Sequence, residues 1–98
     1  MTVREVKESP IKQGSAEKIA YQFEYFAWGT PTSPVVTLVE SVTGVSASSL
    51  MSGSPVLVGT KVTTPVITGM TVDKSYKLTS QVDIDSNTLS AYCTIIGE

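Results

Sequence analysis

The chain contains no histidine among its 98 residues. Imidazole is the commonest general base and metal ligand in proteins, and Ser-His or Cys-His activation of a nucleophile also depends on it. The single cysteine, Cys93, excludes an internal disulfide, and it stands in an alternating apolar segment without a cationic neighbour that would stabilise a thiolate. We therefore expect a buried structural thiol at Cys93 and a protein that is not an enzyme, with no catalytic residues and no cofactor.

Charge is also sparse, with seven basic and nine acidic side chains and a net charge of −2. No basic cluster is present to neutralise a phosphate backbone, which argues against a nucleic-acid partner. The N-terminus is charged from Arg4 to Glu8 and has no apolar run of the kind that forms a signal peptide or a membrane anchor. With one cysteine and no export signal, we expect the domain to fold in the cytoplasm without a membrane partner.

One short segment partly matches the sequence pattern of a calcium-binding loop. Asp83, Asp85 and Asn87 follow the spacing of the first ligands of an EF-hand loop. The sixth position of that loop is Thr88 instead of glycine, and the twelfth is Thr94 instead of glutamate. We therefore interpret the segment as a solvated hairpin turn and expect no metal site, while a weak calcium site between the carboxylates stays open as the alternative.

Alternation of apolar and polar residues dominates the chain and has the period of two that is typical of β-strands. The predicted strands cover residues 19–25, 35–40, 56–58, 61–68, 70–72, 76–82 and 89–96. Pro65 indicates either an edge strand or a break within 61–68, because it cannot donate a hydrogen bond to a neighbouring strand. About seven short strands separated by turn residues predict an all-β fold, specifically an immunoglobulin-like β-sandwich of about seven antiparallel strands. We expect residues 1–98 to form one domain, with residues 1–16 as an N-terminal arm or an edge strand.

Tyr76 gives this fold a local signature. Immunoglobulin-like domains often carry a tyrosine corner, in which a Tyr stands two residues before the position that antibodies fill with Cys. The segment Asp73-Lys-Ser-Tyr-Lys-Leu78 has that form, with Leu78 in the place of the Cys. We therefore expect Tyr76 near the start of a core strand.

Five of the seven aromatic residues fall in one short segment, from Tyr21 to Trp28. Tyr21, Phe23 and Tyr25 alternate as the buried face of a strand. Phe26 and Trp28 fall on the opposite face if that strand continues without interruption. Either a bulge turns both rings into the core, or they project outward as anchors for a partner, and the pattern leaves both alternatives open.

The segment 41–60 contains no charged residue. Ser, Gly and Pro divide it into short pieces, which is typical of plain loops and short strands. Depletion of charge is also a property of interface cores, so a contact surface is the second interpretation of this segment.

Two segments of the chain resemble a known group of proteins. Residues 17–31 (EKIAYQFEYFAWGTP) and 69–79 (GMTVDKSYKLT) are similar to small β-sandwich proteins that are encoded among the structural genes of tailed bacteriophages. Those proteins typically have a short arm, a strand of the form acid-x-apolar-x-Tyr-x-Phe-acid, a Trp, and a Gly-x-x-Tyr-x-Leu-Thr segment before a final hairpin. The resemblance covers most of the chain from Glu17 onward, and this chain departs from it in its Val- and Thr-rich middle and its single Trp.

The resemblance implies a non-enzymatic virion structural protein, assembled in the host cytoplasm, that contacts tail, fibre or capsid subunits. A fibre-tail adaptor is the first assignment, and a head-tail connector piece and a capsid decoration protein stay open. Phe26, Trp28, an edge strand and the N-terminal arm are the candidate contacts, and self-association is a further option. The alternative function is an immunoglobulin-like carbohydrate- or protein-binding module of a bacterial surface adhesin.

Overall fold

The computed structural model describes residues 2–5 and 11–98, with residues 2–5 and Ala27 described by their backbone alone. The strands are β1 (Thr2–Glu5), β2 (Ile11–Gln13), β3 (Gln22–Glu24), β4 (Thr32–Glu40), β5 (Met51–Ser52), β6 (Val56–Val58), β7 (Lys61–Thr63), β8 (Val66–Ile67), β9 (Ser75–Ile84) and β10 (Asn87–Gly97). Two short 3-10 helices, η1 (Phe26–Trp28) and η2 (Ser48–Leu50), lie between strands. The described residues contain no α-helix, so the expected all-β class is confirmed.

The main sheet has the strand order β1-β10-β9-β4, and β2 pairs with a second part of β10. Strands β9 and β10 form a long antiparallel hairpin in which Ile84 stands opposite Asn87. Asp85 and Ser86 form its turn with positive φ angles of 50° and 70°, as two-residue hairpin turns of this hand require. The hairpin turn that the sequence predicts is therefore present.

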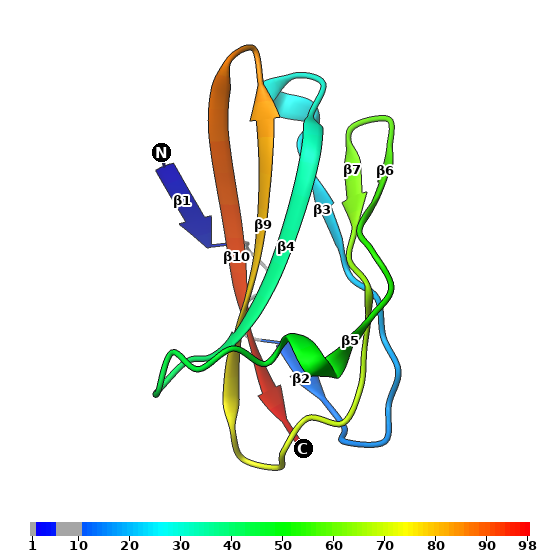
Figure 1. Ribbon diagram of the computed structural model, residues 1–98, viewed down its shortest axis with the longest axis vertical. Coiled ribbons are helices and arrows are strands. Elements are labelled where there is room, and N and C mark those ends of the chain that lie inside the picture. The colour runs from blue at the N-terminus through cyan, green and yellow to red at the C-terminus, as the bar shows by residue number, and fades with distance from the viewer. Residues whose placement is uncertain (1, 6–10) are drawn as a thin grey trace.

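A second layer faces the main sheet (Figure 1), and it is built from the strands β3-β7-β6 and the pair β5-β8. Strands β7 and β8 are separated at Pro65, which has no N–H to donate to a neighbouring strand. Ile19 and Ile67 exchange backbone hydrogen bonds of 3.1 and 2.9 Å and so extend the contact between the β3 and β8 segments. Of the two alternatives at Pro65, an edge strand or a break, the structure has the break.

The core lies between these two layers. The buried apolar side chains include Leu38, Leu78, Val82, Cys93 and Ile95 in the main sheet and Phe23, Val62 and Ile67 in the opposite layer. Each follows the inward positions of the alternating pattern, because successive side chains of a strand point to opposite faces. The thiol of Cys93 is buried in this core, as expected.

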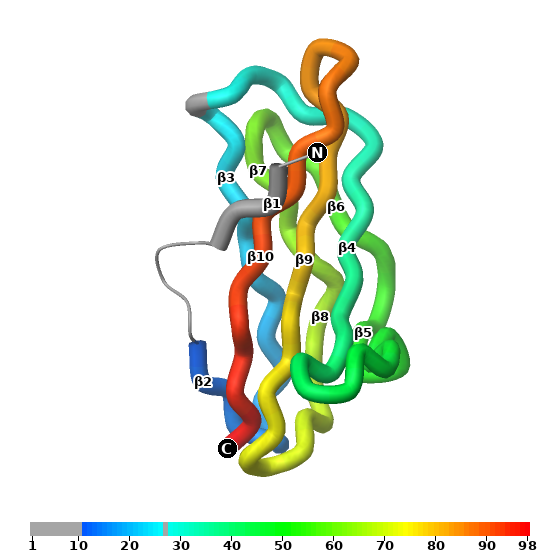
Figure 2. Tube along the Cα trace, turned by 90° about the vertical axis from the view of Figure 1, so that its left-hand side faces the viewer, coloured from blue at the N-terminus to red at the C-terminus, as the bar shows by residue number. Residues whose placement is uncertain are grey.

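Three expectations about the strands are corrected. Strands β1 and β2 run parallel to β10, not antiparallel (Figure 2 shows β2 beside β10). No hairpin joins either strand to β10, so nothing in the connection imposes an antiparallel direction. The segment 19–25 contributes the strand Gln22–Glu24 and an isolated bridge at Ile19, and residues 70–72 form no strand because the chain turns there.

The N-terminal segment joins the edge of the main sheet through β1 and β2, which supports the edge-strand alternative for residues 1–16. Residues 1 and 6–10 lie outside the described part of the chain.

A buried polar side chain, that of Gln13, fastens β2 to the core. Its Nε2 donates hydrogen bonds to the carbonyl oxygens of Ile67 (2.7 Å) and Glu17 (3.2 Å). Its Oε1 accepts a hydrogen bond of 2.7 Å from the hydroxyl of Tyr21. Both the nitrogen and the oxygen of the amide thus have partners, as a fully buried glutamine requires.

The titration of Tyr21 should report on this network. Burial, and to a lesser degree the nearby Cys93 and Glu17, raises the pKa of Tyr21 from 10.0 to about 12. Because the unfolded chain then loses this proton at a lower pH than the folded chain, the contribution of Tyr21 to stability is full below about pH 10 and is lost as the pH rises to about 12.

We therefore expect the tyrosinate absorbance to show a component near pH 12 that disappears in the Tyr21→Phe variant. Buried Tyr25, whose pKa is also raised, serves as the internal comparison, because its titration above the usual pH range of tyrosine should be unchanged in the Tyr21→Phe variant. A Tyr21 that titrates like free tyrosine would contradict the burial of its hydroxyl against Gln13.

Candidate functional site

Three connections meet at one end of the molecule, the upper end in Figure 1. They are the segment between β3 and β4 that contains η1, the turn between β6 and β7, and the turn between β9 and β10. The backbone N–H of Tyr25 donates to the carbonyl oxygen of Thr60 (2.9 Å), which ties the first connection to the second. We call the surface formed by residues 24–29, 59–61 and 83–86 the aromatic end.

Phe26 and Trp28, the two candidate contact residues, both lie in η1 at this end. The strand ends at Glu24 because Tyr25, with φ −114° and ψ 14°, leaves the extended conformation. The chain therefore neither continues as a strand nor forms the bulge that would bury both rings. Phe26 is 77% exposed and Trp28 is 40% exposed, so the inward alternative is wrong for both rings, although part of the Trp28 ring packs on Tyr25.

Trp28 rests on a buried neighbour. The rings of Tyr25 and Trp28 have centroids 5.8 Å apart and an interplanar angle of 56°, a tilted arrangement that aromatic pairs favour. The hydroxyl of Tyr25 donates to Ser80, with the side-chain oxygen at 2.9 Å. Burial raises the pKa of Tyr25, and the hydrogen bond to Ser80 partly opposes that rise. Tyr25 thus connects the exposed turn to the centre of the main sheet.

The turn is held in one conformation by its own backbone and by Gly29. The N–H of Trp28 donates to the carbonyl oxygen of Tyr25 (2.9 Å). Gly29 has a φ of 121°, and a Cβ at this position would lie 2.9 Å from Cγ2 of buried Ile84, so the chain passes too close to β9 for a larger residue. A turn that is already ordered loses little conformational entropy when a partner binds.

Three acidic residues lie at this end of the molecule, and only Glu24 is close to η1 in the sequence. Asp85 follows the end of β9, and its Oδ2 lies 3.9 Å from the position that a Cβ on Gly29 would take. Glu24 accepts a hydrogen bond of 2.8 Å from the Thr60 hydroxyl, and Asp83 accepts one of 3.0 Å from Thr88. The turn of the β9–β10 hairpin brings Asp85 beside Gly29, whereas Asp83 lies on the outward face of β9 between the buried Val82 and Ile84.

Strand β4 lies at an edge of the main sheet, and part of this edge is covered. The N–H of Ala47 donates to the carbonyl oxygen of Leu38 (2.8 Å), and the N–H of Glu40 donates to that of Val45 (2.9 Å). Near its other end, Pro34 has no N–H to offer a new strand. Addition of a new strand is therefore hindered at both ends of β4.

Alanine substitutions should separate the two aromatic rings by their effect on stability. Phe26→Ala should change the free energy of unfolding by less than about 0.5 kcal/mol, because most of the ring is already in solvent. Trp28→Ala should lower it by about 1 to 2 kcal/mol, because part of the ring packs on Tyr25. Urea denaturation of both variants measures this difference, and a loss for Phe26→Ala as large as that for Trp28→Ala would contradict the described positions.

Within the described residues, no three His, Cys, Asp or Glu side chains are grouped as a metal site would need. Among the same residues, no helix has the length and apolar character needed to cross a bilayer. The chain matches no protein-family model, and comparisons with curated proteins and with solved structures find no significant match.

Proposed function

We propose that this chain is a non-enzymatic structural protein of a tailed bacteriophage virion, a fibre-tail adaptor or a similar accessory subunit, that joins its neighbours through the aromatic end. The observation that carries the proposal is the exposed pair Phe26 and Trp28, held in an ordered turn on the buried Tyr25. Aromatic side chains on a rigid support are the residues that contribute most to protein interfaces. The resemblance of residues 17–31 to phage structural proteins includes this same turn.

We further propose that the fold is an immunoglobulin-like β-sandwich. The order β3-β7-β6 corresponds to the strands B, E and D of that fold, and β4-β9-β10 corresponds to C, F and G. Tyr76 supports the assignment as a tyrosine corner, because it stands buried near the start of β9 and its hydroxyl accepts a hydrogen bond of 2.9 Å from the N–H of Thr71.

This assignment also supports the aromatic end as a recognition surface. In variable domains of antibodies, the B–C and F–G connections of one end of the sandwich bind the antigen. The corresponding connections here are residues 25–31, which contain Phe26 and Trp28, and the turn at Asp85 and Ser86. The same end of the fold would thus present the contacts in both cases.

Mass spectrometry of purified particles from the phage or prophage that encodes the chain tests the proposal. We expect the chain in intact virions at a constant ratio to a major structural protein. Its absence from intact virions would overturn the structural assignment. A protein that is absent from particles but binds an array of glycans as a monomer through Phe26 would instead favour the adhesin alternative.

A further inference from the structure

The net negative charge of the described side chains is concentrated at the aromatic end. Residues 11–98 carry five lysines and seven acidic side chains, for a net charge of −2. Three of these acids, Glu24, Asp83 and Asp85, belong to the aromatic end together with one lysine, Lys61. The seven acids less these three, and the five lysines less Lys61, leave four of each, so the rest of the described surface is electrically balanced.

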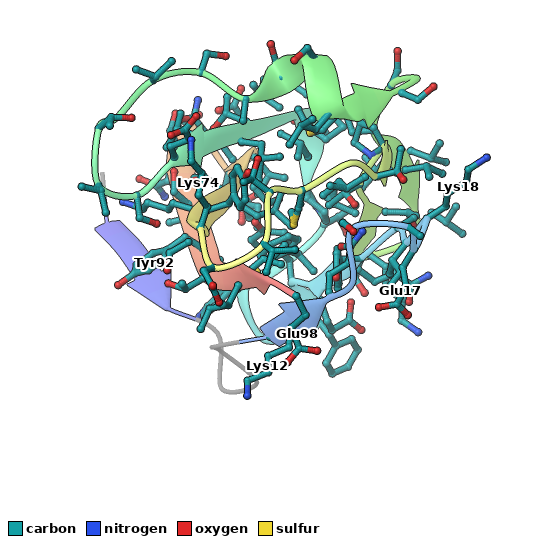
Figure 3. The ribbon with its side chains drawn as sticks, turned by 90° about the horizontal axis from the view of Figure 1, so that it is seen from below. Lys12, Glu17, Lys18, Lys74, Tyr92 and Glu98 are labelled. Atoms are coloured by element: carbon teal, nitrogen blue, oxygen red, sulfur yellow. The ribbon has the colours of Figure 1, made fainter. Side chains whose placement is uncertain are left out.

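The opposite end shows this balance directly (Figure 3). The charged side chains labelled there are Lys12, Glu17, Lys18, Lys74 and Glu98. Ion pairs join Lys12 to Glu98 (3.7 Å) and Lys74 to Glu40 (3.2 Å). Two of the three lysines labelled at this end therefore have acidic partners within the chain.

The carboxylates of the aromatic end have neutral hydrogen-bond donors instead. Glu24 accepts from the Thr60 hydroxyl and Asp83 from the Thr88 hydroxyl, which fixes both groups but leaves their charge in place. Lys61 stands opposite Glu24 on the neighbouring strand and offsets one of the three charges. Exposed rings and three carboxylates that are offset by one lysine thus lie at the same end of the molecule.

We propose that the aromatic end binds a basic protein surface, in which Lys or Arg side chains surround an apolar pocket that takes Phe26 and Trp28. The inference rests on the proposed function and adds the chemistry of the partner. An apolar centre with a charged rim is the usual construction of a protein interface, and complementary rims increase the association rate and exclude wrong partners.

A second copy of the same end does not fit this surface. Two aromatic ends face to face would bring six carboxylates together against two lysines, and like charges across an interface weaken association. The mixed charges of the opposite end offer no excess of positive charge either. The partner is therefore a different protein whose contact surface carries net positive charge.

The chemistry of the partner can be tested before the partner is identified. The full chain is used to select binders from a displayed library of random short peptides. We expect the enriched peptides to combine apolar residues with Lys or Arg. Their binding should weaken roughly tenfold between about 50 and 500 mM salt, because screening removes the attraction of the rim.

Two sets of variants separate this inference from the proposed function. The double variant Phe26→Ser and Trp28→Ser should abolish enrichment. The double variant Asp83→Asn and Asp85→Asn keeps the size and hydrogen-bonding oxygen of each side chain, and it should weaken the selected peptides roughly tenfold at low salt and little at high salt. Asp73→Asn at the opposite end is the matched control, since Asp73 has a positive φ like that of Asp85.

Each outcome decides one claim. Enrichment that survives loss of the two rings, or no enrichment at all, overturns the aromatic end as a docking surface and with it this inference. Ring-dependent enrichment of neutral or acidic peptides, or binding that is unchanged by Asp83→Asn and Asp85→Asn, leaves the docking surface in place and overturns the basic partner.

Discussion

Replacing Gly97 by alanine should lower the free energy of unfolding by about 3 kcal/mol or more, although the residue is the second last of the chain. A Cβ at this position would overlap the carbonyl oxygen of Thr71 and lie 3.0 Å from its carbonyl carbon. The backbone cannot simply move away, because Gly97 donates to the carbonyl of Lys74 (2.9 Å) and accepts from the N–H of Asp73 (3.0 Å). Relief of the overlap therefore breaks hydrogen bonds that hold the connection before β9.

Gly44→Ala is the matched control for this substitution. Gly44 has a positive φ of 71° and nothing within 4 Å of an added Cβ, so alanine there should cost about 1 kcal/mol through backbone strain alone. Urea denaturation of both variants measures the two effects. A Gly97→Ala variant as stable as Gly44→Ala would show that β10 does not approach residue 71 as described.

Replacing Gln13 by leucine should lower the free energy of unfolding by about 3 to 5 kcal/mol, since each buried polar group left without a partner costs about 1 to 3 kcal/mol. Two groups lose their partner at once, the hydroxyl of Tyr21 and the carbonyl oxygen of Glu17. The carbonyl oxygen of Ile67 loses its shorter hydrogen bond and keeps the one from the N–H of Ile19 (3.1 Å). The leucine has about the size of the lost side chain, so the effect comes from unpaired polar atoms more than from a cavity.

Gln22→Leu is the comparison for Gln13→Leu. Gln22 lies on the exposed face of β3 and makes one long hydrogen bond of 3.4 Å with Thr63, so its replacement should change stability by less than about 0.5 kcal/mol. Tyr21→Phe should have an intermediate effect of about 1 kcal/mol, because it removes one of the three partners. Equal stability of the two leucine variants would contradict the buried position of Gln13.

The long strands of the main sheet could be predicted from the sequence because their period of two extends over many residues. Tyr76, Leu78 and Val82 on β9 and Cys93 and Ile95 on β10 all point inward as their spacing indicates. Such a pattern fixes which face of a strand is buried, since a shift of one residue would expose every apolar side chain.

The same pattern does not indicate which strand lies beside which, or in which direction. The parallel pairing of β1 and β2 with β10 depends on a connection across the fold. The burial of Gln13 is also not indicated by local spacing, because its side chain is hydrogen-bonded to Ile67 and Tyr21, which lie elsewhere in the sequence. Contacts between residues far apart in the sequence, such as Gly97 with Thr71, are likewise invisible in local spacing.

For the candidate site, the sequence predicts the two aromatic residues but not the acidic residue beside them. The change of phase at Phe26 and Trp28 marked the place where the chain leaves the strand, and both residues lie in the resulting turn. The carboxylate of Asp85 could not be assigned to the same surface, because its place beside Gly29 comes from the packing of the β9–β10 hairpin.

Incorporation of the double variant Phe26→Ser and Trp28→Ser into virions tests the central claim most directly. The measurement is the amount of variant in purified particles relative to the wild-type chain. The control is Val42→Ser, a substitution of an exposed apolar residue in the connection that follows β4, at the opposite end of the molecule. We expect the double variant to remain folded and its incorporation to fall roughly tenfold or more, while Val42→Ser enters normally. Incorporation of the folded double variant at the wild-type level would contradict the aromatic end as the contact surface.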